Sequence, residues 1–458
     1  KIEQSIIYFK RDLVSKLADR QYLAVGLLGP AILSLLLAYF TRYNGGNAYT
    51  FRLNENIMAF IFMCVITSMF FGLMVSSEEI IRDRKILKRE AFLNLSWVSY
   101  LNSKIMILFI LSAIQTFSFV LIGNLILGIK GMTLFYWLVL FTTSCFANVL
   151  GLCLSSAFNS VIAVYILIPF IIIPQLLFSG VLVPFDKLHL GKNKTHEYVP
   201  VIGDLMTARW AYEAIVIKQF RDNGFERLIF QHNVDEARNV KYNRIIDQMK
   251  RDISASITDS KAENEESPAV RLSRIKKYLV MLSEEAGKDA GSLSGLLVPE
   301  EFNSQAATKI NSFLDELKKS FTEEIKSVWR NREAVISAYE KENGAGSIVK
   351  LQEQNDNESL SNSVRGLNKP GQLVIGSGDK YIPTMDLAYL PGTSRFGRAH
   401  FYAPSKMVGN YETDTFWFNL LVIWIESVLL YLALCLSVPS KCINWLGSIR
   451  FRRQDIPL

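Results

Sequence analysis

Hydrophobic residues gather in six long stretches, five within the first 184 residues and one near the end of the chain. The stretches cover residues 22–41, 56–75, 105–128, 132–157, 161–184 and 416–438. An α-helix needs about 20 apolar residues to cross a bilayer, and each stretch is close to that length or longer. Buried helices of soluble proteins are rarely so long and so apolar. The pattern therefore predicts six transmembrane helices.

A long polar segment separates the fifth stretch from the sixth. Its first part, 225–345, contains charged sequences of helical periodicity interrupted by breakers, which predicts helices at 225–258, 268–286 and 299–343. The last of these has apolar residues at helical spacing on one face, as expected for a helix that packs on others. They are Phe313, Leu314, Leu317, Phe321, Ile325, Val328 and Trp329.

The second part of this segment, 346–410, is rich in Gly, Ser, Asn and Pro, and we expect it to be irregular. A basic and aromatic cluster at 395–402 either contacts lipid headgroups or a partner, or is buried against the last span. The predicted fold class is mainly α. It consists of a six-helix transmembrane domain and a helical domain inserted at 223–410 between spans five and six.

The charged residues indicate how the chain is oriented. Segment 185–413 contains 32 basic and 32 acidic residues, so the net charge of +7 belongs to the rest of the chain. There, Lys and Arg concentrate in segment 1–20, in loop 76–104 and in the C-terminal tail. Basic loops remain cytoplasmic. We therefore predict a multi-pass protein of a cell membrane, such as a bacterial inner membrane, with cytoplasmic termini and 185–413 outside, and no nucleic-acid partner.

The segment ahead of the first span shows one apolar helical stripe flanked by basic residues. The stripe consists of Ile2, Ile6, Phe9, Leu13 and Leu17. This pattern is typical of an amphipathic helix in the membrane interface. A plain basic flank of the first span is the alternative interpretation.

Loop 76–104 carries charges of both signs and is too long for a simple turn between two spans. It predicts a cytoplasmic helix that docks on another protein. The alternative is a solvated basic loop that serves topology alone.

Four landmarks of the sequence resemble the membrane domain of ABCG-type exporters, within the ABC-2 group of ABC permeases. The first is the amphipathic helix, and the others are Arg89-Glu90 followed by Trp97-Val98-Ser99-Tyr100 and Lys104, then Phe178-Ser179-Gly180, then Arg209-Trp210-Ala211-Tyr212-Glu213-Ala214. The resemblance covers about residues 1–222 and 411–458. It implies a connecting helix at 1–20, spans one to five at 21–184 with a coupling loop at 76–104, an external re-entrant segment at 185–222, and span six with a cytoplasmic tail at 411–458.

The resemblance also implies roles for single residues. The coupling helix that receives the motion of a nucleotide-binding domain would contain Arg82, Arg84, Lys88, Arg89 and Glu90. Val181 and Leu182 match the apolar gate at the outer end of the substrate cavity. Phe71 falls where the family has a cavity phenylalanine, although ordinary helix packing is the explanation that we favour for a phenylalanine at this position.

ATP hydrolysis is not encoded in this chain. The phosphate-binding pattern G-x-x-x-x-G-K-[ST] does not occur, and the glycine-rich Gly376–Lys380 lacks its spacing. We therefore expect no cofactor here, with ATP and Mg²⁺ on a partner nucleotide-binding domain that is either fused upstream or separate. The start at Lys1 instead of Met suits a fused domain. A homodimer is expected because such transporters need two membrane domains, and the scattered histidines predict no metal site.

Glu426 lies in the middle of the sixth stretch. A carboxylate at that depth is costly and normally faces protein or water. We expect it to be either protonated or paired with a polar group of a neighbouring helix.

Two functions fit these observations. The first is an ATP-driven exporter that moves an apolar or amphipathic, lipid-like molecule outward through the gate. The second is mechanotransmission, in which ATP-driven motion acts through the external domain on an envelope partner without moving a substrate. The family resemblance and the retained gate favour export, whereas the size of the insertion favours mechanotransmission.

Overall fold

The computed structural model describes residues 2–43, 49–89, 96–189, 197–258, 267–298, 302–368 and 371–448. The chain divides into two compact units. The first, which we call the membrane unit, consists of Lys1–Leu188, Pro200–Gln219 and Thr415–Leu458. The second, the insertion unit, consists of His189–Val199 and Phe220–Asp414.

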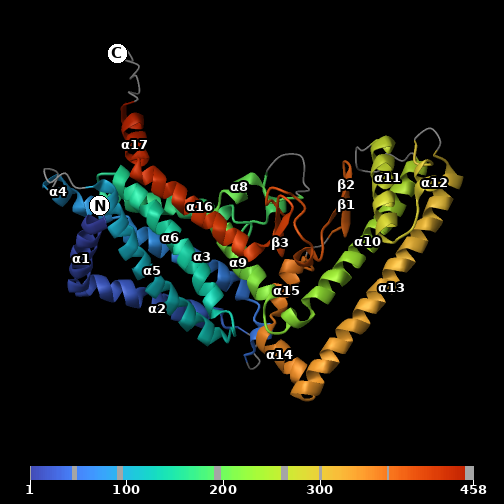
Figure 1. Ribbon diagram of the computed structural model, residues 1–458, viewed down its shortest axis with the longest axis horizontal. Helices are drawn as coiled ribbons and strands as arrows, with labels where there is room; N and C mark the ends of the chain where they lie inside the picture. Colours follow the sequence, from blue (N-terminus) through green and yellow to red (C-terminus); the bar gives the residue numbers. More distant parts are fainter. Residues whose placement is uncertain are drawn as a thin grey trace, which may run out of the picture. The chain divides into compact units, whose positions relative to one another are not determined.

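The membrane unit is built from helices (Figure 1). They are α1 (Ile2–Ala18), α2 (Arg20–Thr41), α3 (Ile57–Ser76), α4 (Glu79–Arg89), α5 (Trp97–Leu127), α6 (Thr133–Ala157), α7 (Val161–Leu177), α8 (Val201–Asp204), α9 (Thr207–Arg221), α16 (Thr415–Cys435) and α17 (Val438–Ser448), with short 3₁₀ turns at Phe51–Leu53 and Phe185–Lys187. The prediction of a mainly helical protein with membrane-spanning helices is confirmed.

Five of the described helices are long and apolar enough to cross a membrane, namely α2, α3, α5, α6 and α16. The fifth predicted span is shorter than expected, because α7 ends at Leu177 instead of residue 184. Gly180 follows with a φ of 80°, a conformation that turns the chain and that suits glycine. Helix α5 is longer than expected and begins at Trp97, so the predicted loop 76–104 contains α4 and the first turns of α5.

Helix α6 lies between α3, α5 and α16 and is the most buried of the described long apolar helices (Figure 1). Small residues let α3 approach it closely. A Cβ atom added to Gly72 of α3 would lie 2.7 Å from Ala147 Cβ of α6, and one added to Gly151 of α6 would overlap the Ser76 hydroxyl. Membrane helices use such residues for close backbone packing.

The insertion unit contains the long helices α10 (Glu226–Thr258) and α13 (Ser304–Asn343), which pack side by side (Figure 1). Helix α11 (Pro268–Glu285) and the short α12 (Gly291–Ser294) complete this layer. One apolar core joins them, with members such as Ile246, Leu279 and Phe321. The apolar face predicted for 299–343 supplies three members of this core, Leu314, Leu317 and Phe321, and the partly buried Phe313 packs against it.

Segment 346–410, for which we expected an irregular conformation, contains regular elements. They are α14 (Ser347–Asn355), α15 (Glu358–Arg365), the hairpin of β1 (Val374–Ser377) and β2 (Lys380–Pro383), a 3₁₀ turn (Leu387–Tyr389) and β3 (Ser405–Val408), which pairs with β4 (Tyr411–Asp414). Strands of four residues are too short to show a periodicity in the sequence. Two of the glycines belong to the turns, since Gly378 and Gly409 connect the paired strands with φ values of 56° and 62°.

Candidate functional site

A buried lysine connects three helices at one end of the membrane unit. The Nζ atom of Lys104, on α5, lies 2.8 Å from Asp12 Oδ1 of α1, 2.9 Å from Glu79 Oε2 and 2.8 Å from Asp83 Oδ2 of α4. The Lys104 side chain is only 3% exposed. Buried charges are costly unless they are paired and hydrogen-bonded, so these four residues hold α1, α4 and α5 in one arrangement. We call them the Lys104 cluster.

Further polar and aromatic contacts surround the Lys104 cluster. Lys16 of α1 forms a second ion pair with Glu79, and its Nζ donates a hydrogen bond of 3.2 Å to the Tyr22 hydroxyl. The Tyr100 hydroxyl donates to Asp83 Oδ2 at 3.0 Å, and the Tyr8 ring packs edge-on against Tyr100. Every carboxylate of the cluster therefore has a basic partner, and aromatic rings shield the pairs from water.

The basic residues expected on the coupling helix lie on α4 but differ in their surroundings. The Arg84 guanidinium donates to the carbonyl oxygens of Ser155, Ser156 and Phe158 at 3.3, 3.1 and 2.9 Å, and so caps the C-terminal end of α6. Arg84 therefore has a structural role that the sequence did not indicate. Arg82 is exposed and lies 3.7 Å from Glu78.

Lys88 and Arg89 are exposed at the end of α4. Together with Arg82, they form the part of the expected coupling surface that the structure leaves accessible. Glu90, the last residue of that prediction, lies outside the described residues.

Helix α9, which contains the predicted Arg-aromatic-Ala-Tyr-Glu-Ala sequence, has a buried ion pair. Arg209 Nη1 lies 3.1 Å from Glu213 Oε2, and the Arg209 side chain is 2% exposed. Arg209 also pairs with Asp204, and Asn419 Nδ2 of α16 donates to Glu213 Oε2 at 2.8 Å. This network fixes α9 against α16 inside the apolar bundle.

Glu426, the carboxylate expected in the sixth span, lies on α16 and accepts a hydrogen bond of 2.7 Å from the Thr207 hydroxyl at the start of α9. The next backbone amide, that of Ala208, donates to Gln175 Oε1 of α7 at 2.9 Å. The polar partner that we expected for Glu426 is thus a threonine at the start of α9. Side chains of α16 and α7 thus accept hydrogen bonds from the first two residues of α9.

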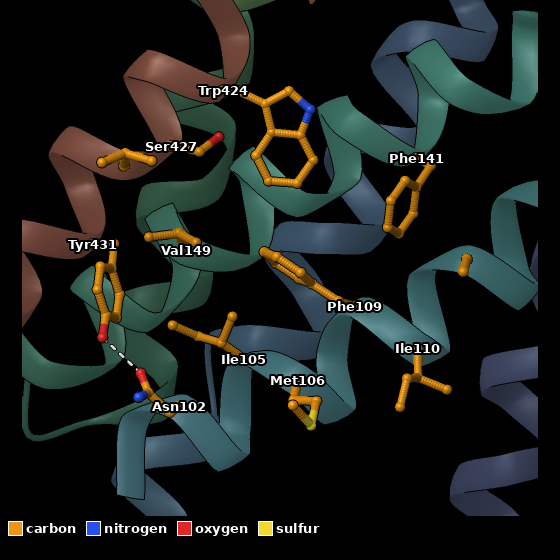
Figure 2. Close-up of a pocket in the computed structure, with 12 residues that line it drawn as sticks. Asn102, Ile105, Met106, Phe109, Ile110, Phe141, Val149, Trp424, Ser427 and Tyr431 are labelled. Atoms are coloured by element: carbon orange, nitrogen blue, oxygen red, sulfur yellow. Dashed lines mark hydrogen bonds between the residues drawn. The ribbon is translucent and has the colours of Figure 1, made fainter. Parts of the chain in front are cut away.

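An apolar cavity of about 580 Å³ lies between α5, α6 and α16 (Figure 2). We call it the α5–α16 cavity. The Phe109 ring stands at its centre, with centroids 6.4 Å from Phe141 and 6.1 Å from Trp424, both in edge-on geometry. The remaining lining residues are Asn102, Ile105, Met106, Ile110, Ala113, Val149, Ser427, Val428 and Tyr431.

One end of the α5–α16 cavity is polar. The Tyr431 hydroxyl donates a hydrogen bond of 2.6 Å to Asn102 Oδ1 across the cavity (Figure 2). Asn102 precedes Lys104 by two residues on α5, and Leu434 of α16 belongs to the same apolar cluster as Tyr100. The polar end therefore adjoins the Lys104 cluster. A cavity with apolar walls and one polar end suits an apolar or amphipathic molecule.

The residues expected to form the gate and cavity lie in other parts of the membrane unit. Val181 is half-buried in the turn after α7, and the apolar Leu182 side chain is 62% exposed. Phe71 is half-buried on α3 next to α2, where a Cβ atom on Gly29 would meet its ring at 4.0 Å. Neither Phe71 nor the two gate residues line the α5–α16 cavity.

Sequence reasoning did not single out Asp12, Glu79 and Asp83 or the lining of the cavity. The available signals were weak: Asp12 and Lys16 are four residues apart, as are Glu79 and Asp83, so each pair shares a helix face. Within the described residues, no group of three or more His, Cys, Asp or Glu side chains is arranged to hold a metal ion.

Comparison with known proteins assigns the membrane unit. Residues 3–220, which include α1 to α9, match the family model described as ABC-2 type transporter. A comparison with curated proteins gives no match to the chain. The matched region contains the Lys104 cluster and the α9 ion pair, together with most of the α5–α16 cavity. Residues 3–220 thus form an ABC-2 type transporter domain, which is consistent with a membrane permease subunit that pairs with an ABC nucleotide-binding domain.

Proposed function

We propose that this permease exports an apolar or amphipathic molecule, with energy from ATP bound with Mg²⁺ on a nucleotide-binding domain that is fused upstream or separate. Two copies of the chain form the transporter. The termini and α4 lie on the cytoplasmic side, and the insertion unit lies outside, as the distribution of basic residues indicates.

The observation that carries this proposal is that one helix, α5, contributes to both the Lys104 cluster and the α5–α16 cavity. Lys104 is bound to α1 and α4, whereas Asn102, Phe109 and other residues of α5 line the cavity. A displacement of α4 therefore moves α5, because separating Lys104 from Glu79 would leave buried charges unpaired. Movement of α5 alters the cavity wall that faces α16.

The exposed end of α4 is the surface that we assign to the nucleotide-binding domain. Lys88 and Arg89 are exposed, whereas internal contacts occupy Arg84. Two accessible cations suit a complementary acidic surface on the partner. Nucleotide-driven movement of that partner would thus reach the Lys104 cluster along a single helix.

The turn after α7 suits an outer gate. Gly180 has a φ of 80°, and a Cβ atom there would overlap the Phe185 ring, so the turn holds Val181 and Leu182 in a defined position. An exposed leucine at the end of an apolar helix can close against its counterpart in a second copy. The homodimer and this closure are parts of the same proposal.

A transport assay tests the proposed function. The complex with its nucleotide-binding domain is reconstituted in vesicles, and ATP-dependent movement of a fluorescent amphiphile is measured. Phe109→Ala and Trp424→Ala enlarge the α5–α16 cavity and should change which amphiphiles stimulate ATP hydrolysis and are moved. Leu125→Ala is the matched control, since Leu125 lies on α5 but is exposed and does not line the cavity.

Two results would contradict export. One is ATP hydrolysis without movement of any amphiphile tested, combined with a requirement for the insertion unit, which is the behaviour of a mechanotransmission permease. The other is an unchanged amphiphile profile in both cavity variants, which would remove the α5–α16 cavity from the substrate path.

A further inference from the structure

The insertion unit contains a cavity of about 310 Å³ with mostly apolar walls. We call it the Lys241 cavity. It lies between α10, α11, strand β2 and the chain that follows the Leu387–Tyr389 turn. The apolar part of its wall consists of Ile245, Met281, Ile382, Pro383, Leu387, Leu390 and Pro391, with the rings of Tyr278 and Tyr381 beside them.

A network of hydrogen bonds holds the wall of the Lys241 cavity in place. The Tyr381 backbone amide donates to the Tyr278 hydroxyl at 3.1 Å, and the Tyr381 hydroxyl donates to Asp252 Oδ2 at 2.8 Å. Arg274 pairs with the same oxygen at 2.9 Å and donates to the Gly378 carbonyl at 2.9 Å. The β1–β2 hairpin is thus fixed to α10 and α11, so the cavity is formed in advance of any ligand.

Lys241 is one of the two lysines that line this cavity. Its ammonium group lies 5.1 Å from the Tyr242 ring centroid and forms no ion pair with another described residue. Burial lowers the pKa of Lys241, the charge of Arg238 lowers it further, and the charge of Glu285 acts in the opposite direction. An anion placed next to Lys241 would compensate this unfavourable environment.

The other polar groups of the lining already have partners. Lys380 Nζ lies 2.7 Å from Glu197 Oε2, and the Thr393 hydroxyl donates to Glu197 Oε1 at 3.3 Å. His400 Nε2 lies 2.9 Å from the Leu387 carbonyl oxygen. The Glu197–Lys380 pair is neutral as a whole, so Lys241 determines the positive charge of the cavity.

We propose that the Lys241 cavity binds an anionic amphiphile with a single apolar chain, whose carboxylate or phosphate pairs with Lys241 and whose apolar part lies against Ile245, Met281 and Leu390. The volume supports a single chain, because 310 Å³ is at the lower end of the range for ligand cavities and leaves no room for a two-chain lipid. The binding site lies entirely in the insertion unit and goes beyond the proposed function, since it stands whether or not the membrane unit exports.

Photolabelling of the full chain in lipid nanodiscs tests this site. The probe is palmitic acid with a diazirine in its chain, and the corresponding alcohol is the uncharged probe. After illumination, labelled peptides are mapped by mass spectrometry. The acid should label peptides that contain residues 278–281 and 387–391, and the alcohol should label them at least about tenfold less, as expected when one charge-assisted hydrogen bond is lost.

Variants separate a specific site from general partitioning. Lys241→Met keeps the length of the side chain and should reduce labelling by the acid to the level of the alcohol, whereas Lys241→Arg should retain it. Lys276→Met removes the same charge from an exposed position on α11 and should label like the unchanged protein. Circular dichroism shows whether each variant is folded, and Lys241→Arg keeps the test decisive if Lys241→Met does not fold.

Three results would overturn the proposal. They are equal labelling of these peptides by acid and alcohol, unchanged labelling in folded Lys241→Met, and an absence of label from these peptides with both probes. Because none of these measurements involves ATP or transport, their outcome is independent of the test of export.

Discussion

Lys104 Nζ of α5 lies 2.9 Å from Glu79 Oε2 of α4, and the two side chains are 3% and 8% exposed. The two residues are on different helices. Both belong to segment 76–104, which the sequence alone predicts to be a charged loop. An ion pair so well excluded from water holds the two helices together, because separating them would leave an unpaired buried charge, which is strongly destabilising.

Replacing Lys104 with methionine should destabilise the membrane unit. Asp12, Glu79 and Asp83 would lose a shared partner, and removing one member of a buried charge pair costs about 3–5 kcal/mol. Lys16 still pairs with Glu79, so we expect the lower end of that range. Thermal unfolding in detergent measures the effect.

The control for this variant is Lys10→Met, which removes an exposed cation from α1. It should unfold at the temperature of the unchanged protein. If Lys104→Met were equally stable, the Lys104 cluster would not hold α1, α4 and α5 together, and the proposed coupling route would lose its basis.

Arg84→Gln should lower stability without weakening attachment of the nucleotide-binding domain, because Arg84 caps the end of α6. Loss of charge-assisted bonds to backbone carbonyls should cost about 1–2 kcal/mol. Lys88→Gln with Arg89→Gln should show the reverse, with normal stability and weaker attachment. Thermal unfolding and co-purification of the partner measure the two effects, and Lys85→Gln is an exposed control on the same helix. If Arg84→Gln weakened attachment at unchanged stability, Arg84 would instead contact the nucleotide-binding domain, as first expected.

Gly151→Ala should destabilise the contact between α3 and α6. The added methyl group would overlap the Ser76 hydroxyl and lie 3.1 Å from the Leu73 carbonyl oxygen, so the backbone of α3 has to shift. Overpacking of this kind costs about 1–3 kcal/mol. Gly29→Ala on α2 is the control, since its methyl group would meet its nearest neighbour only at 4.0 Å. Equal unfolding temperatures for the two variants would show that α3 and α6 do not approach so closely.

Glu226 of the insertion unit should make stability depend on pH. Burial raises the pKa of Glu226 above its ordinary 4.5, although hydrogen bonds from Asn233 and Tyr389 act in the opposite direction. The folded state therefore holds this proton more tightly than the unfolded state. The resulting stabilisation is complete below pH 4.5 and is lost as the pH rises through the folded-state pKa.

Glu226→Gln tests this dependence, because glutamine keeps the acceptor oxygen for both hydrogen bonds and carries no charge. The variant should match the unchanged protein below pH 4.5 and exceed it in thermal stability at neutral pH. Glu358→Gln, at an exposed position of α15, should leave the pH profile as it is. A Glu226→Gln profile parallel to that of the unchanged protein would place the pH dependence elsewhere.

The sequence predicted the helices of the membrane unit well, because length and apolar composition are local properties that a bilayer requires of any spanning helix. The ends of α5 and α7 were less predictable. Trp97 begins α5 inside a stretch that resembles a charged loop, and the turn at Gly180 ends α7 inside a stretch that is still apolar.

The candidate site was predictable only in part. The sequence predicted a charged cytoplasmic helix in the loop that contains α4. It also identified Glu426 as a carboxylate inside a predicted span. Its partner Thr207 comes from a segment more than two hundred residues earlier. No periodicity in the sequence links two such residues. The same holds for the side chains of α5, α6 and α16 that line the α5–α16 cavity.

By itself, the sequence determined that this chain crosses a membrane, that an amphipathic helix precedes the spans and that a largely helical unit is inserted before the last one. These properties depend on the composition of single segments. Only the tertiary structure decided that Lys104 is buried among Asp12, Glu79 and Asp83 while Lys88 stays accessible. Both are lysines of the same polar stretch, and they differ only in which neighbouring helices exclude water from them.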